Sequence, residues 1–130
     1  VKAKIVPKGS VVMTCVGDLG VVSLIGTDMV INQQLHAFLP SDEVNPSFLS
    51  YMLSFKKGYM VKMASNTTVP YMNKSICNSV PIFLPPANLQ KRFSQTVDHV
   101  KKIIDKDIFS VKRSNELFNS LSQQAFSGNL

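Results

Sequence analysis

Residues 88–126 read NLQKRFSQTVDHVKKIIDKDIFSVKRSNELFNSLSQQAF and contain neither proline nor glycine. Pro85 and Pro86 stand just before this stretch, and Gly128 stands just after it. Prolines before and a glycine after such a stretch are the usual boundaries of a helix. The stretch therefore predicts one long helix. The alternative is two shorter helices that fold back between residues 107 and 114, where the sequence has no helix breaker.

Apolar side chains recur along this predicted helix at the spacing of a coiled coil. One series takes every seventh residue from Phe93 to Leu121, and a second takes every seventh residue from Val97 to Ala125. Eight of these ten residues are apolar, and the two polar ones, Asp107 and Ser114, lie together in the middle. A helix of this length would extend roughly 58 Å at ~1.5 Å per residue, more than a small domain can cover. We therefore expect a second helix, in cis or in a homodimer, to pair with the apolar seam, which consists of Phe93, Val97, Val100, Ile104, Val111, Phe118, Leu121 and Ala125.

The part of the chain before this helix is predicted to be rich in β-structure. Residues 11–16 and 21–25 are mostly β-branched and apolar, and the turn-forming residues 17–20 separate them. Residues 29–39 alternate less regularly but keep an apolar character. A short edge strand is also predicted at residues 80–84, because Pro81 lacks the N–H that a central strand needs.

A shorter helix is predicted in the middle of the chain. Asn45 has the side chain of an N-cap residue, and Pro46 suits the first helical position. The paired lysines 56 and 57 would lie in the last turn, with Gly58 ending the helix. Residues 65–75 lack any period and predict a loop. The whole pattern is that of an α+β protein, a small β-rich domain with short helices followed by one long coiled-coil helix.

Composition narrows the class of function. The chain has 130 residues, enough for about one domain. Its 14 Lys and Arg against 8 Asp and Glu give a net charge of +6, which fits a polyanionic partner such as nucleic acid. No acidic residue lies between Glu43 and Asp98, although ordinary solvated lysines would explain the charge equally well. No apolar run is long enough to cross a membrane, and we expect a soluble protein of a reducing compartment.

No catalytic constellation is apparent in the sequence. It has no glycine-rich phosphate loop and no serine in the setting of a hydrolase nucleophile. His36 is interpreted as a satisfied strand residue and His99 as a solvated helix residue, while Cys15 and Cys77 have the apolar neighbours of small buried side chains. We therefore expect no catalytic residue, no metal ligand set and no cofactor.

Residues 65–75 and their flanks are the candidate binding surface. They combine amides and hydroxyls that can meet base edges with lysines that can meet phosphates, and recognition commonly lies on loops. An ordinary surface loop is the alternative interpretation. The residues expected to bind DNA are Lys56, Lys57, Lys62, Asn66, Thr67, Thr68, Tyr71, Asn73 and Lys74.

Four stretches in this order resemble the specificity subunit of type I restriction-modification systems. They are PKGSVVMTCVGDLG at residues 7–20, INQQ at 31–34, NKS at 73–75 leading to VPIFLPP at 80–86, and SLSQQAFSGNL at 120–130. The resemblance covers almost the whole chain. It implies that residues 1–85 are the later part of a target recognition domain, incomplete at its N-terminal side. It also implies that residues 86–130 are a conserved helix for helix pairing and subunit docking.

This resemblance implies a non-catalytic module in the cytoplasm of a bacterium or archaeon. Such a module would read one half of a bipartite double-stranded DNA target. It would position modification subunits, which methylate adenine with S-adenosylmethionine, and restriction subunits, which cleave with ATP. Two rivals stay open: a helical adaptor or dimerisation scaffold that does not bind DNA, and a fragment of an enzyme whose active site lies elsewhere.

Overall fold

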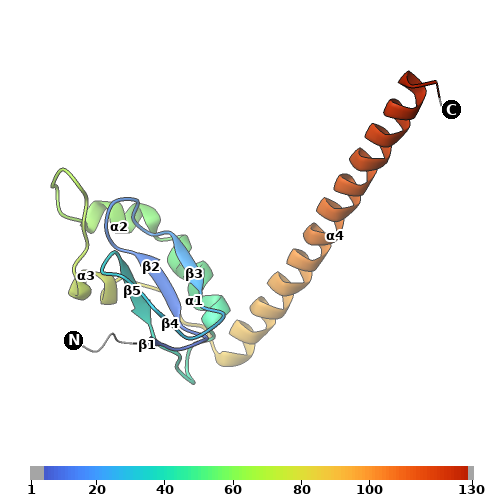
Figure 1. The fold of residues 1–130 in the computed structure, drawn as a ribbon. Helices are drawn as coiled ribbons and strands as arrows, with labels where there is room; N and C mark the ends of the chain where they lie inside the picture. The colour runs from blue at the N-terminus through green and yellow to red at the C-terminus, as the bar shows by residue number, and fades with distance from the viewer. Residues whose placement is uncertain (1–4, 129–130) are drawn as a thin grey trace. The chain divides into compact units, whose positions relative to one another are not determined.

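The computed structural model describes residues 5–128. A single helix at the C-terminal side follows five short strands and three short helices in this part of the chain (Figure 1). In chain order the elements are β1 (Ile5–Val6), β2 (Val11–Thr14), β3 (Val22–Leu24), β4 (Met29–Val30), β5 (Leu35–Phe38), α1 (Pro46–Ser54), α2 (Lys57–Met63), α3 (Lys74–Asn78) and α4 (Ala87–Phe126).

The strands form two small antiparallel sheets. The larger has the order β3-β2-β5, with Val11 of β2 opposite Leu24 on one side and opposite Phe38 on the other. In the smaller, β1 pairs with β4. The predicted strands at residues 11–16 and 21–25 thus form a hairpin, and the 29–39 region supplies β4 and β5. This confirms the α+β class.

Glycine is required where the β2–β3 turn meets α2. Gly20 has a φ of 76°, in the left-handed region that side chains disfavour. A Cβ atom at this position would also lie 2.9 Å from Sδ of Met60 on α2. The residue therefore permits both the turn and the close approach of the helix.

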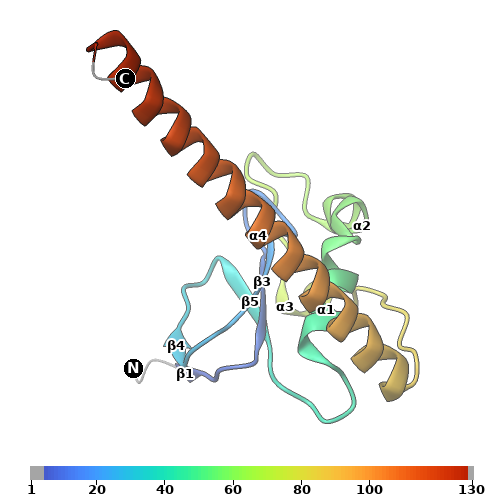
Figure 2. The same ribbon diagram turned by 90° about the vertical axis from the view of Figure 1, so that its right-hand side faces the viewer.

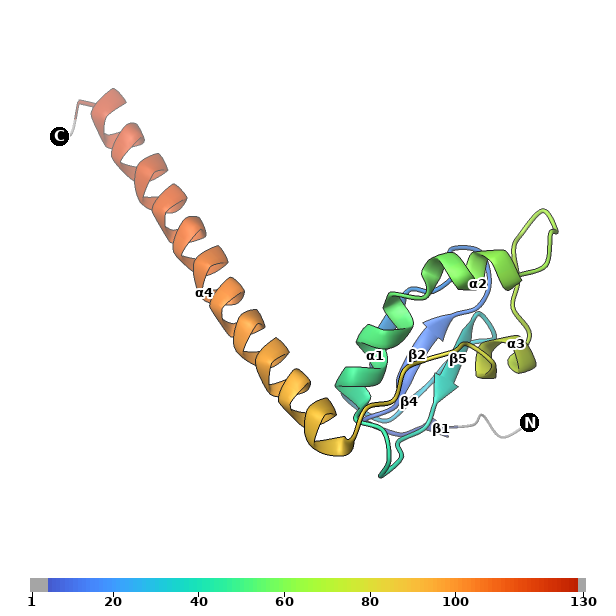
Figure 3. The same ribbon diagram turned by 180° about the vertical axis from the view of Figure 1, so that it is seen from behind.

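The two faces of the larger sheet are covered differently. Helices α1 and α2 lie against one face, and the β1–β4 pair lies on the other side (Figures 2 and 3). Side chains alternate along β2, so the main core gathers on the helical side around Met13, Leu53 and Met60. A smaller cluster of Val6, Val12 and Ile25 fills the other side.

The middle helix departs from its prediction at its C-terminal end. Asn45 caps α1 as expected, its Oδ1 accepting a hydrogen bond from the Phe48 backbone N–H at 3.0 Å. However, Gly58 does not end the helical segment, because α2 begins at Lys57 and contains it. Fully buried Met60 explains the difference, since packing of α2 on the sheet outweighs the intrinsic helix cost of one glycine.

Two further local predictions are wrong. Residues 80–84 form no strand in the described structure, and Val80 is instead buried in the main core. The loop predicted at 65–75 ends at Asn73, because Lys74 already begins α3.

Helix α4 is continuous from Ala87 to Phe126, which confirms one long helix over two folded-back helices. The described residues up to Ser94 form one compact unit, and those from Gln95 onward form a second, wholly helical unit. Within the described residues, no helix is both long and apolar enough to span a membrane.

Candidate nucleic-acid interface

The polar loop between α2 and α3 is pinned to the sheet at its C-terminal end. The Gly17 N–H donates to the Pro70 carbonyl at 2.9 Å, and the Met72 N–H donates to the Cys15 carbonyl at 2.9 Å. The Ser65 N–H closes the loop by donating to the Tyr71 carbonyl at 3.0 Å. Residues 66–69 therefore project from a fixed base, visible at the upper left of Figure 1.

The side chains of this loop divide into two kinds. The Thr67 hydroxyl is used inside the loop, donating to the Val69 carbonyl at 2.7 Å and lying 3.1 Å from Oγ of Ser65. Asn66 and Thr68 are exposed on the projecting part. Tyr71 is 47% exposed although its backbone bridges to Val16. The loop thus presents an amide, a hydroxyl and a flat ring to solvent.

Asn73 has a structural role that its sequence position did not reveal. Its Oδ1 accepts a hydrogen bond from the Ile76 N–H at 2.9 Å and so caps α3. The amide Nδ2 is not used by that cap, and the side chain is exposed. Lys74 follows as the first residue of α3 and is exposed as well.

The three lysines of the α2 region lie at its two ends. Lys56 and Lys57 are at the start, and Lys57 Nζ lies 2.7 Å from Oδ1 of Asp18 in the β2–β3 turn. Lys62 is exposed in the last turn of α2, directly before the projecting loop. The structure thus brings Lys62 to the loop, whereas Asp18 balances the charge of Lys57.

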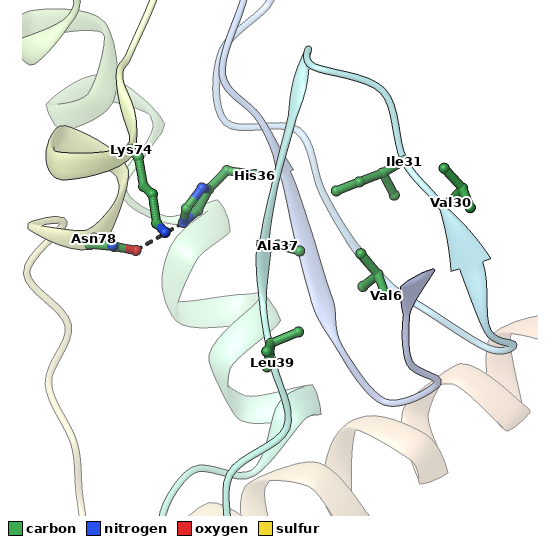
Figure 4. A pocket seen from close by; sticks show the side chains of 8 residues that line it. All are labelled: Val6, Val30, Ile31, His36, Ala37, Leu39, Lys74 and Asn78. Atoms are coloured by element: carbon green, nitrogen blue, oxygen red, sulfur yellow. Dashed lines mark hydrogen bonds between the residues drawn. The ribbon is translucent and has the colours of Figure 1, made fainter. Parts of the chain in front are cut away.

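A cavity of about 570 Å³ lies beside this region and was not predicted (Figure 4). On one side stand His36 of β5, Asn78 at the end of α3 and Lys74; His36 Nε2 and Asn78 Oδ1 are 2.9 Å apart. The prediction that His36 is a satisfied strand residue is confirmed. Its partner lies 42 residues away in sequence, which no local pattern could show. The remaining lining is apolar: Val6, Val30, Ile31, Ala37 and Leu39.

The first turns of α4 are fixed to α1 by a buried polar network. Gln90 is 2% exposed; its Oε1 accepts from the Asn45 N–H at 2.8 Å and its Nε2 donates to the Pro85 carbonyl at 2.8 Å. The Ser94 hydroxyl donates to Oδ1 of Asn45 at 2.6 Å. Phe93 adds edge-to-face contacts with Phe48 and Tyr51, at centroid distances of 5.6 and 5.5 Å.

The predicted seam therefore divides between the two units. Phe93 packs within the compact unit, and Val97 is half-buried. The later members are exposed, with Val111 at 61% and Phe118 at 70%. Ile103 and Ile108 are exposed too and widen the apolar stripe beyond the two seven-residue series. The other exposed seam members are Val100, Ile104, Leu121 and Ala125.

The two thiols have no reactive setting. Cys15 and Cys77 are free and buried. Burial raises the pKa of both thiols, that of Cys77 to about 11, which disfavours the nucleophilic thiolate. Among the described residues no group of three or more His, Cys, Asp or Glu side chains could hold a metal ion.

Comparison with known proteins gives a consistent result. Residues 1–119 match the family described as "Type I restriction modification DNA specificity domain". The type I restriction enzyme MjaIX specificity subunit of Methanocaldococcus jannaschii is 22% identical over 125 residues, which are 95% of this chain and 28% of that protein.

Solved structures share the fold. The type I restriction-modification S subunit from M. genitalium aligns with a TM-score of 0.72 and 18% identity, over 98% of this chain and 35% of that one. The HsdS subunit from Thermoanaerobacter tengcongensis aligns with a TM-score of 0.66 and 21% identity, over 100% of this chain and 32% of that one. The chain thus spans about a third of the length of these relatives.

Proposed function

Because the chain belongs to the family of type I restriction modification DNA specificity domains, we propose that it recognises a DNA sequence and takes no part in catalysis. The observation that carries this proposal is the projecting loop at residues 66–69. Its C-terminal end is pinned to the sheet, and it presents Asn66 and Thr68 to solvent. It lies next to exposed Lys62, within a stretch that has no acidic residue. Amides and hydroxyls on a rigid support can read base edges, while lysines hold the phosphates.

The two parts of the chain would have separate tasks. Residues 1–85 would act as a target recognition domain that reads one half of a bipartite target. Residues 86–130 would pair through the exposed apolar stripe with a second helix and dock the modification subunit. The relatives' names, which describe specificity subunits of type I enzymes, support modification and restriction subunits as the partners. Such a complex would act in the cytoplasm, where the DNA lies.

The lysines at the two ends of α2 test the phosphate part of this proposal. Lys56→Ala with Lys62→Ala should weaken binding to every DNA sequence alike and flatten the dependence of log K on log salt, by about 0.9 for each phosphate that the variant no longer neutralises. Binding of the full chain to duplexes of several sequences, measured by fluorescence anisotropy across a salt series, gives this slope.

Lys57→Ala is the matched control. Asp18 already occupies the Lys57 ammonium, so this variant should change the slope less than removal of the Lys62 charge does. An unchanged slope in the double variant would rule out these lysines as phosphate-binding groups. A folded chain with no DNA affinity at moderate salt would instead favour the helical adaptor.

A further inference from the structure

The cavity of Figure 4 combines an apolar wall with a polar rim. Val6, Val30 and Ile31 form part of the wall, on the side of the β1–β4 pair. The rim comes from two elements that are distant in sequence, β5 with His36 and α3 with Lys74 and Asn78. None of the lining residues is acidic. A flat, partly apolar group with polar atoms on one edge fits such a site.

Two of the rim residues, His36 and Asn78, are held in place by their surroundings. The His36 ring makes an edge-to-face contact with Phe38 at a centroid distance of 4.8 Å. The α3 helix is anchored to the core by Cys77, which is 1% exposed, and its first turn is capped by Asn73. Side chains that are fixed before a ligand arrives lose little conformational entropy on binding.

The hydrogen-bonding capacity of the rim is dominated by donors. Oδ1 of Asn78 is engaged by Nε2 of His36, so the ring nitrogen donates and the Asn78 amide keeps two N–H donors on Nδ2. The Lys74 ammonium supplies further donors and carries no acceptor. A ligand that offers adjacent acceptors is therefore favoured over one that offers donors.

Among the bases, guanine best matches this requirement. In the major groove guanine presents two acceptors, N7 and O6, whereas adenine pairs N7 with a donor and cytosine presents a donor. The cavity also continues the surface already described, because Lys74 directly follows Asn73 at the end of the polar loop. We propose that the rim of His36, Lys74 and Asn78 reads one guanine of the DNA target. This inference rests on the proposed function.

Asn78→Asp tests the proposal with almost no change of shape. The carboxylate can still accept from His36, but it removes both donors and adds a charge that repels the guanine acceptors. The full chain and the variant are each used to select binders from a randomised duplex pool. The wild type should select a motif that contains a guanine. The variant should lose preference at that one position by about 10- to 100-fold and keep the rest of the motif.

A base analogue identifies the contact independently. Replacing the guanine with 7-deazaguanine removes N7 and keeps base pairing, so it should weaken binding of the wild type and leave the Asn78→Asp variant unaffected. Such coupling between protein and base changes marks a direct contact. Gln33→Ala is the matched control, because Gln33 is an exposed polar residue just before β5 that does not line the cavity. Thermal unfolding of all three proteins verifies the fold.

The outcomes separate this inference from the proposed function. A wild type that selects no motif contradicts the proposed function. A wild type with a clear motif and an Asn78→Asp variant with the same motif contradicts only the guanine contact, as expected if the cavity instead holds a segment of another protein. A motif without guanine, or an equal decrease at every position in the variant, also overturns the contact.

Discussion

At the scale of single residues, Gln90 is the side chain on which most polar contacts of the α1–α4 junction depend. It is buried, and its amide satisfies the Asn45 N–H, the Pro85 carbonyl and, at 3.2 Å, the Glu43 carbonyl. Without the Gln90 amide, each of these partly buried backbone groups would lose this hydrogen-bond partner. A buried polar group that loses its partner costs about 1–3 kcal/mol.

Gln90→Ala should therefore lower the free energy of unfolding by about 2–3 kcal/mol. Gln95→Ala, an exposed glutamine on the same helix, should change it by less than about 0.5 kcal/mol. Urea denaturation followed by circular dichroism measures both. Equal stability of the two variants would show that the Gln90 network adds nothing to the junction.

Cys77 gives the fold a dependence on alkaline pH. Its pKa is raised from 9.0 to about 11, chiefly by burial, so above pH 9 the unfolded thiol loses its proton while the folded thiol keeps it. The contribution of this group to stability is full below pH 9 and is lost as the pH rises toward 11. Between pH 8 and pH 10.5 the free energy of unfolding, measured by denaturation at both pH values, should decrease less in Cys77→Ala than in the wild type. The same decline in both proteins would contradict a buried, protonated thiol.

Residue-scale predictions from the sequence were good where a side chain acts through its neighbours in the chain. The Asn45 cap and the buried cysteines follow from local pattern alone. The Gln90 network and the His36–Asn78 pair do not, because their partners lie 45 and 42 residues away. Sequence spacing carries no information about such contacts until the fold is known.

At the scale of elements, the short helix α3 depends on its N-terminal cap for stability. This five-residue helix is too short to be stable by itself, and Asn73 satisfies one of its free N–H groups. The cap also sets the position of Lys74 and Asn78, which belong to the cavity rim.

Asn73→Ala should destabilise the protein by about 1 kcal/mol, and Asn73→Ser, which preserves a capping oxygen, should recover most of this stability. Thermal unfolding measures the two effects. If Asn73 also reads a base through its free Nδ2, the serine variant will restore stability but not the preference for that base. Equal stability of alanine and serine variants would argue against the cap.

The exposed apolar stripe of α4 predicts that copies of the isolated chain pair with one another. In the isolated chain a second copy is the available partner for the exposed apolar residues, so helical circular dichroism should increase with protein concentration. Val111→Asp places a charge in the stripe and should shift this dependence to at least about tenfold higher concentration. Ser120→Asp, nine residues from Val111 and therefore on the opposite face of the helix, should have little effect. A signal independent of concentration in the wild type would contradict pairing between copies.

Element boundaries were harder to predict than the elements themselves. The long helix was clear because nothing interrupts residues 88–126. The predictions of a helix end at Gly58 and of a strand at residues 80–84 were wrong. The structure of a glycine or of a short apolar run depends on what packs against it. Here Met60 draws α2 onto the core, and Val80 enters the same core without a partner strand in the described structure.

At the scale of the whole chain, the proposed recognition and pairing surfaces belong to different units. The polar loop, the lysines and the cavity are all in the unit that ends at Ser94, whereas most of the exposed apolar stripe follows Gln95. If the chain reads DNA with one unit and assembles through the other, as proposed, it needs no catalytic group of its own. Both candidate surfaces are hypotheses from the sequence and stay predictions. The cavity could not be expected from the sequence, because it needs β5 and α3 side by side.

Recognition of a DNA sequence by this chain can be tested directly. The most direct measurement is selection by the full chain from a randomised duplex pool at several salt concentrations, followed by sequencing of the bound fraction. If the chain reads a DNA sequence, total binding should fall steeply with salt while one motif becomes enriched as the salt rises, because phosphate contacts are screened and base contacts persist. Binding without an enriched motif at any salt concentration, or no binding at all by a folded chain, would contradict sequence recognition by this chain.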